Sequence, residues 1–132
     1  AAFPDMHISL NGGVEGLDAA EAFLRSGLDG VMVGRAAYHQ PWDILGRADS
    51  RIFGQPDPAQ SRTDVVARMQ PYIERQMGQG VRLPQITRHM LGLFAGQPGA
   101  RHWRRVLSEN AHKPGAGPEL LDTALQTVAL AA

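Results

Sequence analysis

Two glycine-rich turns, Asn11-Gly12-Gly13 and Gly34-Arg35, combine residue types that could bind phosphate. Each turn follows a short run of residues expected to form a strand, 7–10 and 30–33. Glycine lets backbone amides approach an anion closely, and arginine adds a guanidinium suited to charge-assisted hydrogen bonds. Asn11 is a candidate polar contact beside them. Taken singly, a glycine turn of this kind is most often only a strand-to-helix connection.

The chain between the turns predicts one amphipathic helix. Apolar residues recur at helical spacing from Leu17 to Ser26, and Gly27 follows where a helix commonly ends. The run 30–33 is apolar at consecutive positions, which is typical of a strand buried on both faces of a parallel sheet. Two parallel strands joined by a helix place both turns at one sheet edge. This arrangement matches the phosphate site that (β/α)8 barrels build after their last two strands.

The sequence changes character near residue 58. A second helix is expected from Pro41 to about Ala48, with the proline at its first position. The glycine- and proline-rich run 53–58 then predicts a linker. Beyond it, Ser61 with Asp64 three residues later is a capping signal, and four helices are expected at 61–78, 84–96, from about 99, and 118–130. Their short connections predict a four-helix bundle. The aromatic residues are expected in the core: Tyr38, Trp42, Tyr72 and Phe94.

The third of these helices carries a second candidate site. At about 100° per residue, Trp103 and Leu107 fall on one face, whereas the opposite face carries Arg101, Arg104 and Arg105 with no acid among them. Planar guanidinium groups suit phosphodiesters, so this face is a candidate contact for a nucleic-acid backbone. The alternative is an ordinary solvated helix face.

Charge and composition exclude several classes of protein. The net charge is zero, but residues 1–61 carry four arginines against eight acids, while residues 62–132 carry nine basic side chains against five acids. The basic half favours a polyanionic partner. No apolar run approaches the ~20 residues of a membrane span, and the start does not resemble a signal peptide, so a cytoplasmic location without a membrane partner is expected. There is no cysteine and no metal-ligand spacing of histidines, and no metal is expected.

Four stretches together are similar to a known family. They are 9–13, 29–38, 86–94 and 99–112, and they resemble the C-terminal part of the tRNA-dihydrouridine synthases, best the A-type, or tRNA-dihydrouridine(20/20a) synthase, subfamily. The resemblance extends along essentially the whole chain. It implies an FMN-dependent oxidoreductase that uses NADPH to reduce the C5–C6 bond of D-loop uridines in tRNA.

The same resemblance assigns roles to individual residues. It implies that 1–58 form the last two strands of a TIM barrel with their helices, and that 59–132 form a helical tRNA-binding domain. The FMN phosphate would be held by Asn11, Gly12, Gly13, Gly34 and Arg35, and tRNA would be contacted by Arg101 and Arg104. The family's proton-donor cysteine lies in an earlier barrel segment. We therefore expect no catalytic residue in this chain and no turnover by this chain alone.

Two other interpretations remain open from the residues. One is a non-catalytic helical RNA-binding module, and the other is a phosphate-binding barrel enzyme that acts on a small substrate. Two strands cannot close a barrel and leave two unpaired sheet edges, so pairing with a second copy of the chain is also possible.

Overall fold

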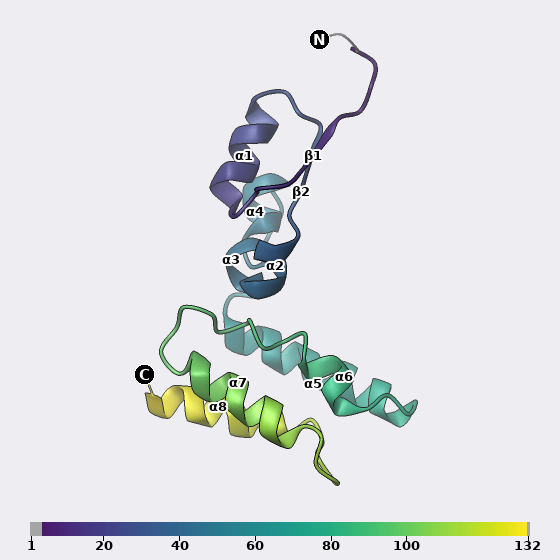
Figure 1. The fold of residues 1–132 in the computed structure, drawn as a ribbon, viewed down its shortest axis with the longest axis vertical. Coiled ribbons are helices and arrows are strands. Elements are labelled where there is room, and N and C mark those ends of the chain that lie inside the picture. The colour runs from purple at the N-terminus through teal and green to yellow at the C-terminus, as the bar shows by residue number, and fades with distance from the viewer. Residues whose placement is uncertain (1–3, 132) are drawn as a thin grey trace. The chain divides into compact units, whose positions relative to one another are not determined.

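The computed structural model describes residues 4–131, which pack as two compact units divided between Pro58 and Ala59. Each unit is described separately below, as the N-terminal unit and the C-terminal unit. The N-terminal unit holds two strands and four helices among its described residues (Figure 1): β1 Ser9–Asn11, α1 Leu17–Arg25, β2 Gly30–Met32, α2 Arg35–His39, α3 Pro41–Leu45 and α4 Ala48–Ile52.

The two strands form a parallel pair, as the sequence predicts. Ser9 pairs with Gly30, Leu10 with Val31 and Asn11 with Met32. The strands first meet at Asp29, whose amide donates to the Ile8 carbonyl at 3.0 Å and whose carboxylate accepts from the Ile8 amide at 2.9 Å. These two bonds help to fix the register. Because the strands are parallel, this register places the ends of both strands at the same edge of the sheet.

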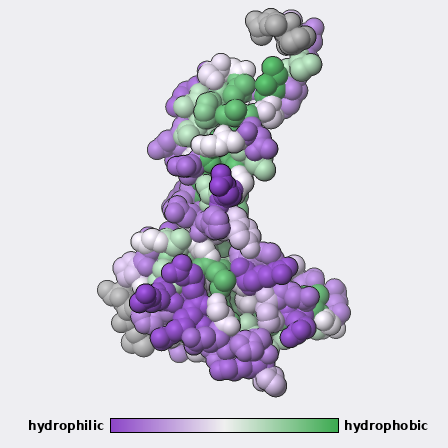
Figure 2. Space-filling model, viewed as in Figure 1, coloured by the Kyte–Doolittle hydropathy of each residue, from purple (hydrophilic) through white to green (hydrophobic). Residues whose placement is uncertain are grey.

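The expectation of a strand buried on both faces is wrong for this chain. Met32 is 50% exposed, and Ile8, Phe23 and Leu45 are also exposed. Figure 2 shows hydrophobic residues gathered on the surface of the N-terminal unit. A single helix beside two strands covers too little of the sheet to bury both faces. Tyr38 is 53% exposed as well, against the prediction of a core position.

The chain after β2 contains more helix than the sequence predicts. Pro41 begins α3 as expected, but α2 and α4 are not among the predicted elements. Gly46 and Arg47 lie between α3 and α4, and a Cβ on Gly46 would lie 2.6 Å from the Trp42 carbonyl oxygen and 2.9 Å from its ring. The glycine therefore permits a close approach of the chain to Trp42.

The segment 53–58 lacks regular structure, as predicted, but it folds back onto α4. The Asp57 carboxylate accepts from the Ser50 amide at 3.0 Å, from the Ser50 hydroxyl at 2.9 Å and from Arg47 at 3.1 Å. The backbone bond from Ser50, its hydroxyl and the Arg47 guanidinium lower the pKa of Asp57 below its usual value. Asp57 thus satisfies an amide in the first turn of α4 that the helix leaves free.

The C-terminal unit consists of α5 Arg62–Gly78, α6 Leu83–Thr87, α7 Ala100–Asn110 and α8 Leu120–Ala131. Ser61 caps α5 by accepting from the Asp64 amide at 3.1 Å, as the sequence predicts. The core of the unit is apolar and includes Val66, Ile73, Leu107, Leu121 and Ala124, all almost fully buried. Phe94 is buried as predicted, whereas Tyr72 is 41% exposed and does not belong to the core.

The predicted helix over 84–96 is wrong after Thr87. The chain continues as successive tight turns, with amides bonding to carbonyls three residues earlier at His89, Met90 and Leu93. Two carbonyls of this segment also accept from side chains of other segments: Trp103 Nε1 donates to the Met90 carbonyl at 2.9 Å and Arg62 Nε donates to the Leu93 carbonyl at 2.9 Å. The apolar spacing is helical, but these tertiary bonds favour turns. The second member of the expected four-helix bundle is therefore only the short α6.

Helices α7 and α8 lie side by side (Figure 1), and Gly99 allows their close approach. Gly99 caps α7 with a φ of 82°, and a Cβ there would lie 2.7 Å from the Val128 Cα and 2.9 Å from its carbonyl oxygen. The start of α7 therefore packs against the final turns of α8, and the two helices are antiparallel.

Gly99→Ala tests this contact. We expect it to lower the unfolding free energy of the C-terminal unit by about 3 kcal/mol, because backbone strain and a clash with α8 add together. Gly96→Ala is the matched control, since Gly96 has a φ of 75° but a Cβ there would meet no atom within 4 Å. The control should lose only about 1 kcal/mol. The measurement is urea unfolding of the C-terminal unit followed by NMR. An equal loss of unfolding free energy in both variants would contradict the contact between Gly99 and α8.

A second tertiary contact joins α4 to α1. Arg51 on α4 donates to Glu21 at 2.6 Å and to Asp18 at 2.5 Å, both on α1. The hydrogen bond from Arg51 lowers the pKa of Glu21, and the bonds to Glu21 and Asp18 raise the pKa of Arg51. The arrangement ties the two helices through one guanidinium.

Arg51→Met should therefore lower the urea midpoint of the N-terminal unit at neutral pH. The folded-state pKa of Glu21 lies below its unfolded value, so the stabilisation is present above the ordinary value of 4.5 and is lost as pH falls through the folded-state pKa. The difference in urea midpoint between wild type and Arg51→Met should therefore become smaller as the pH is lowered. Arg25→Met is the comparison variant. Among residues 4–131 the exposed Arg25 pairs with Glu21 alone, at 3.3 Å, and it lowers the pKa of Glu21 less than Arg51 does, so its pH-dependent effect should be smaller. A difference in urea midpoint that increased at low pH would contradict the proposed contribution of the Arg51–Glu21 contact.

Candidate functional site

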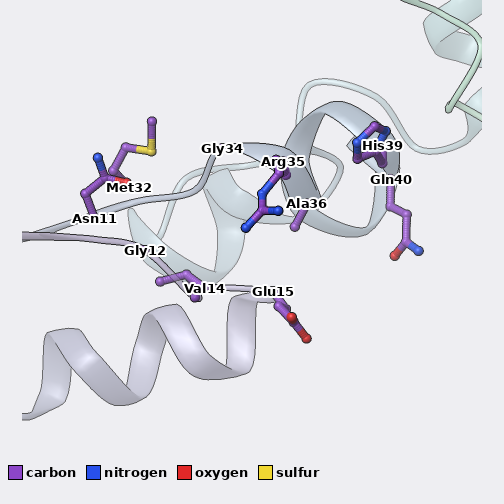
Figure 3. Close-up of a pocket in the computed structure, with 11 residues that line it drawn as sticks. Asn11, Gly12, Val14, Glu15, Met32, Gly34, Arg35, Ala36, His39 and Gln40 are labelled. Atoms are coloured by element: carbon purple, nitrogen blue, oxygen red, sulfur yellow. The ribbon is translucent and has the colours of Figure 1, made fainter.

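The structure brings the two predicted glycine turns together around one open cavity of about 680 Å³. All five predicted phosphate residues line it: Asn11, Gly12, Gly13, Gly34 and Arg35. Figure 3 shows the Arg35 side chain extending from the start of α2 into the space beside the Gly12–Val14 segment. The parallel pairing of Asn11 with Met32 explains the convergence, since both turns leave the sheet at the same edge.

Backbone geometry keeps the first turn open. Gly12 has a φ of 127° and Gly13 a φ of 68°, conformations that L side chains rarely adopt. A Cβ at either position would meet no protein atom within 4 Å. The glycines are therefore needed for the path of the chain, and the space above them belongs to the cavity.

Hydrogen-bond donors at this cavity are available to a ligand. Within residues 4–131, the amides of Gly13 and Gly34 donate to no other group, and the Arg35 guanidinium has no hydrogen-bond or ionic partner. Two free amides and one free guanidinium form a donor set with the chemistry of a phosphate monoester site. One acid, Glu15, lines the same cavity and opposes anion binding there.

Sequence reasoning missed the remaining lining positions as well as Glu15. They are Val14, Met32, Ala36, His39 and Gln40. His39 follows Arg35 by four residues on α2, so a prediction of that short helix would have placed both at one side of the cavity.

The second candidate site lies on α7 and has the predicted geometry. Trp103 and Leu107 are buried at 0% and 1% exposure, while Arg101, Arg104 and Arg105 are exposed on the other side of the helix. In the described part of the chain, none of these three arginines has a hydrogen-bond or ionic partner. We call them the α7 arginine face.

Arg101 lies at the N-terminal end of α7, where a positive charge lowers the stability of the helix. The first turn of α7 holds no acid and includes Arg101. Cations near a helix N-terminus oppose the macrodipole and typically cost about 0.3–1 kcal/mol. Local stability alone would favour an acid there, so Arg101 is better explained by an anionic partner than by helix formation.

Metal sites and membrane-spanning helices are not found in residues 4–131. No group of three or more His, Asp or Glu side chains there could hold a metal ion, and no helix there is long and apolar enough to cross a membrane. The two candidate sites that the sequence predicts are the cavity at the glycine turns and the α7 arginine face.

The chain is similar over almost its whole length to proteins of one family. Residues 1–129 match the family model described as dihydrouridine synthase (Dus). The chain is 52% identical over 126 residues to a tRNA-dihydrouridine(20/20a) synthase of Vibrio cholerae, and the match covers 96% of this chain and 38% of the relative. It is 54% identical over 127 residues to the protein of the same name from Escherichia coli K12, with 96% of this chain and 36% of the relative covered. The chain thus spans a little over a third of the length of these relatives.

Proposed function

Because the chain belongs to the dihydrouridine synthase family, we propose that it is the C-terminal part of an FMN-dependent tRNA-dihydrouridine(20/20a) synthase. In this proposal the N-terminal unit is the end of a TIM barrel, and the C-terminal unit is a helical tRNA-binding domain. The enzyme would reduce the C5–C6 bond of D-loop uridines 20 and 20a, with NADPH as reductant. The observation that carries the proposal is the cavity where both glycine turns and the unpaired Arg35 converge.

The residues at the cavity fit the phosphate of FMN. The amides of Gly13 and Gly34 would donate to its oxygens, Gly12 would let the backbone pass close to it, and Arg35 would neutralise its charge. Asn11 would add a polar contact at the strand end. Bound flavin supplies hydride transfer, which no side chain of a protein can perform. The residues in this chain would bind and orient the cofactor, and none of them is proposed as the catalytic acid.

The α7 arginine face would hold the tRNA backbone, chiefly through Arg101 and Arg104. Guanidinium groups bind phosphates at fixed geometry and set the orientation of the nucleic acid without reading its sequence. Family membership favours this enzyme over a small-substrate barrel enzyme, and the phosphate cavity favours it over a purely RNA-binding module.

The cofactor proposal can be tested by binding rather than by turnover. Equilibrium dialysis of the chain should show tighter binding of FMN than of riboflavin, because only FMN carries the phosphate. Arg35→Gln should remove most of this difference. Glu15→Gln is the matched control, since it removes the opposing charge from the same cavity and should strengthen FMN binding. Equal affinity for FMN and riboflavin in the wild-type chain would contradict the proposed phosphate site.

The tRNA proposal predicts a particular salt dependence. Binding of an unmodified tRNA transcript should weaken as salt rises, and Arg101→Gln with Arg104→Gln should reduce the slope of log K against log salt by about 1.5–2. Arg25→Gln serves as a control for charge removal, because Arg25 lies on α1 in an ion pair with Glu21. An unchanged slope in the double variant would exclude the α7 arginine face as the tRNA contact.

A further inference from the structure

An exposed tyrosine flanked by two free arginines lies on the outer side of α5. Tyr72 is 41% exposed and has no hydrogen bond or ring contact with another described residue. Arg68 precedes it by four residues and Arg75 follows by three, and both are exposed. At about 100° per residue the three side chains fall within about 60° of one another. We call them the α5 tyrosine face.

The opposite side of α5 forms part of the core, so the direction of this face is fixed. Val66 and Ile73 are fully buried at 0% exposure and lie roughly 150° from Arg68 around the helix. Because these two residues anchor α5, the helix cannot rotate to hide Tyr72. A large aromatic ring thus remains on a solvent-facing side of the unit.

The charge of the α5 tyrosine face is not neutralised by its neighbours. Arg68 and Arg75 have no ionic partner among residues 4–131. Asp64 lies one turn before Arg68 on the same side, but its carboxylate accepts from the Gln60 amide at 3.0 Å and its amide donates to Ser61. Two free positive charges therefore flank the exposed ring.

We propose that the α5 tyrosine face binds an unpaired nucleotide of RNA, with its base stacked on Tyr72 and its flanking phosphates on Arg68 and Arg75. Aromatic rings stack on bases that a strand has exposed, whereas the bases of a continuous RNA duplex are covered by stacking and by a deep, narrow groove. The two arginines make the ligand an anion rather than an apolar protein segment. This inference rests on the proposal that the chain binds tRNA, and it adds a surface separate from the α7 arginine face.

Two RNA probes distinguish stacking from backbone contact. The first is an unmodified tRNA transcript, which offers unpaired bases in its loops, and the second is a blunt RNA duplex without unpaired bases. Tyr72→Ala should weaken binding of the tRNA about tenfold and leave binding of the duplex unchanged. The salt slope should also stay unchanged, because no phosphate contact is lost.

Three variants separate the possible roles of the residues. Tyr72→Phe should bind tRNA like wild type, because stacking needs the ring and not the hydroxyl. Arg68→Gln with Arg75→Gln should lower the salt slope by about 1.5–2. Phe53→Ala is the matched control, since Phe53 is 67% exposed on the N-terminal unit and should leave binding unaltered.

Each outcome of the experiment gives a distinct answer. If the wild-type chain binds no tRNA, both this inference and the proposed tRNA function are overturned. If wild type binds tRNA with Arg101-dependent affinity but Tyr72→Ala binds equally well, only this inference is overturned. Equal weakening for tRNA and duplex would also overturn it, because that pattern indicates a structural role of Tyr72. Selective weakening for tRNA supports it.

Discussion

Trp103 lies at the middle of the C-terminal unit with no exposed surface, its ring centre 4.8 Å from that of Phe94 and its Nε1 bonded to the Met90 carbonyl at 2.9 Å. This one side chain fixes two features at once. It holds the turns that follow α6, and it sets the rotation of α7 about its own axis. Because Trp103 points inward, Arg101 and Arg104 must point outward. The availability of the guanidinium groups to a partner is therefore a consequence of core packing.

The N-terminal unit depends on a more local constraint. Asp29 helps to fix the strand register, and the register brings the Gly12–Gly13 turn beside Arg35. Few residues are needed to form this edge, so the cavity can exist although Ile8 and Met32 remain exposed. In the proposed barrel, neighbouring strands and helices would cover such residues. The geometry of the turns therefore does not depend on burial of the strands. The turns are formed in this chain, whereas Ile8 and Met32 remain exposed.

The sequence alone predicts the features that local chemistry determines. The cap at Ser61, the end of α1 at Gly27 and the inward face of α7 follow from residue type and helical period. It does not predict features that distant partners determine. The apolar spacing of 84–96 is helical, yet Trp103 and Arg62 take carbonyls from that segment. Tyr72 has the spacing of a core residue but lies at the edge of the apolar stripe, where only the packed neighbours decide its exposure.

Each unit contains one of the two tryptophans, and their surroundings differ. Trp42 is half-buried with the Arg47 guanidinium 5.9 Å from its ring, whereas Trp103 is fully enclosed and hydrogen bonded. An indole shielded from water emits at a shorter wavelength than one exposed to mobile water dipoles, and a cation near the ring also changes its emission. The protein therefore carries an intrinsic optical label in each half, and light emitted by one label reports on the state of that half.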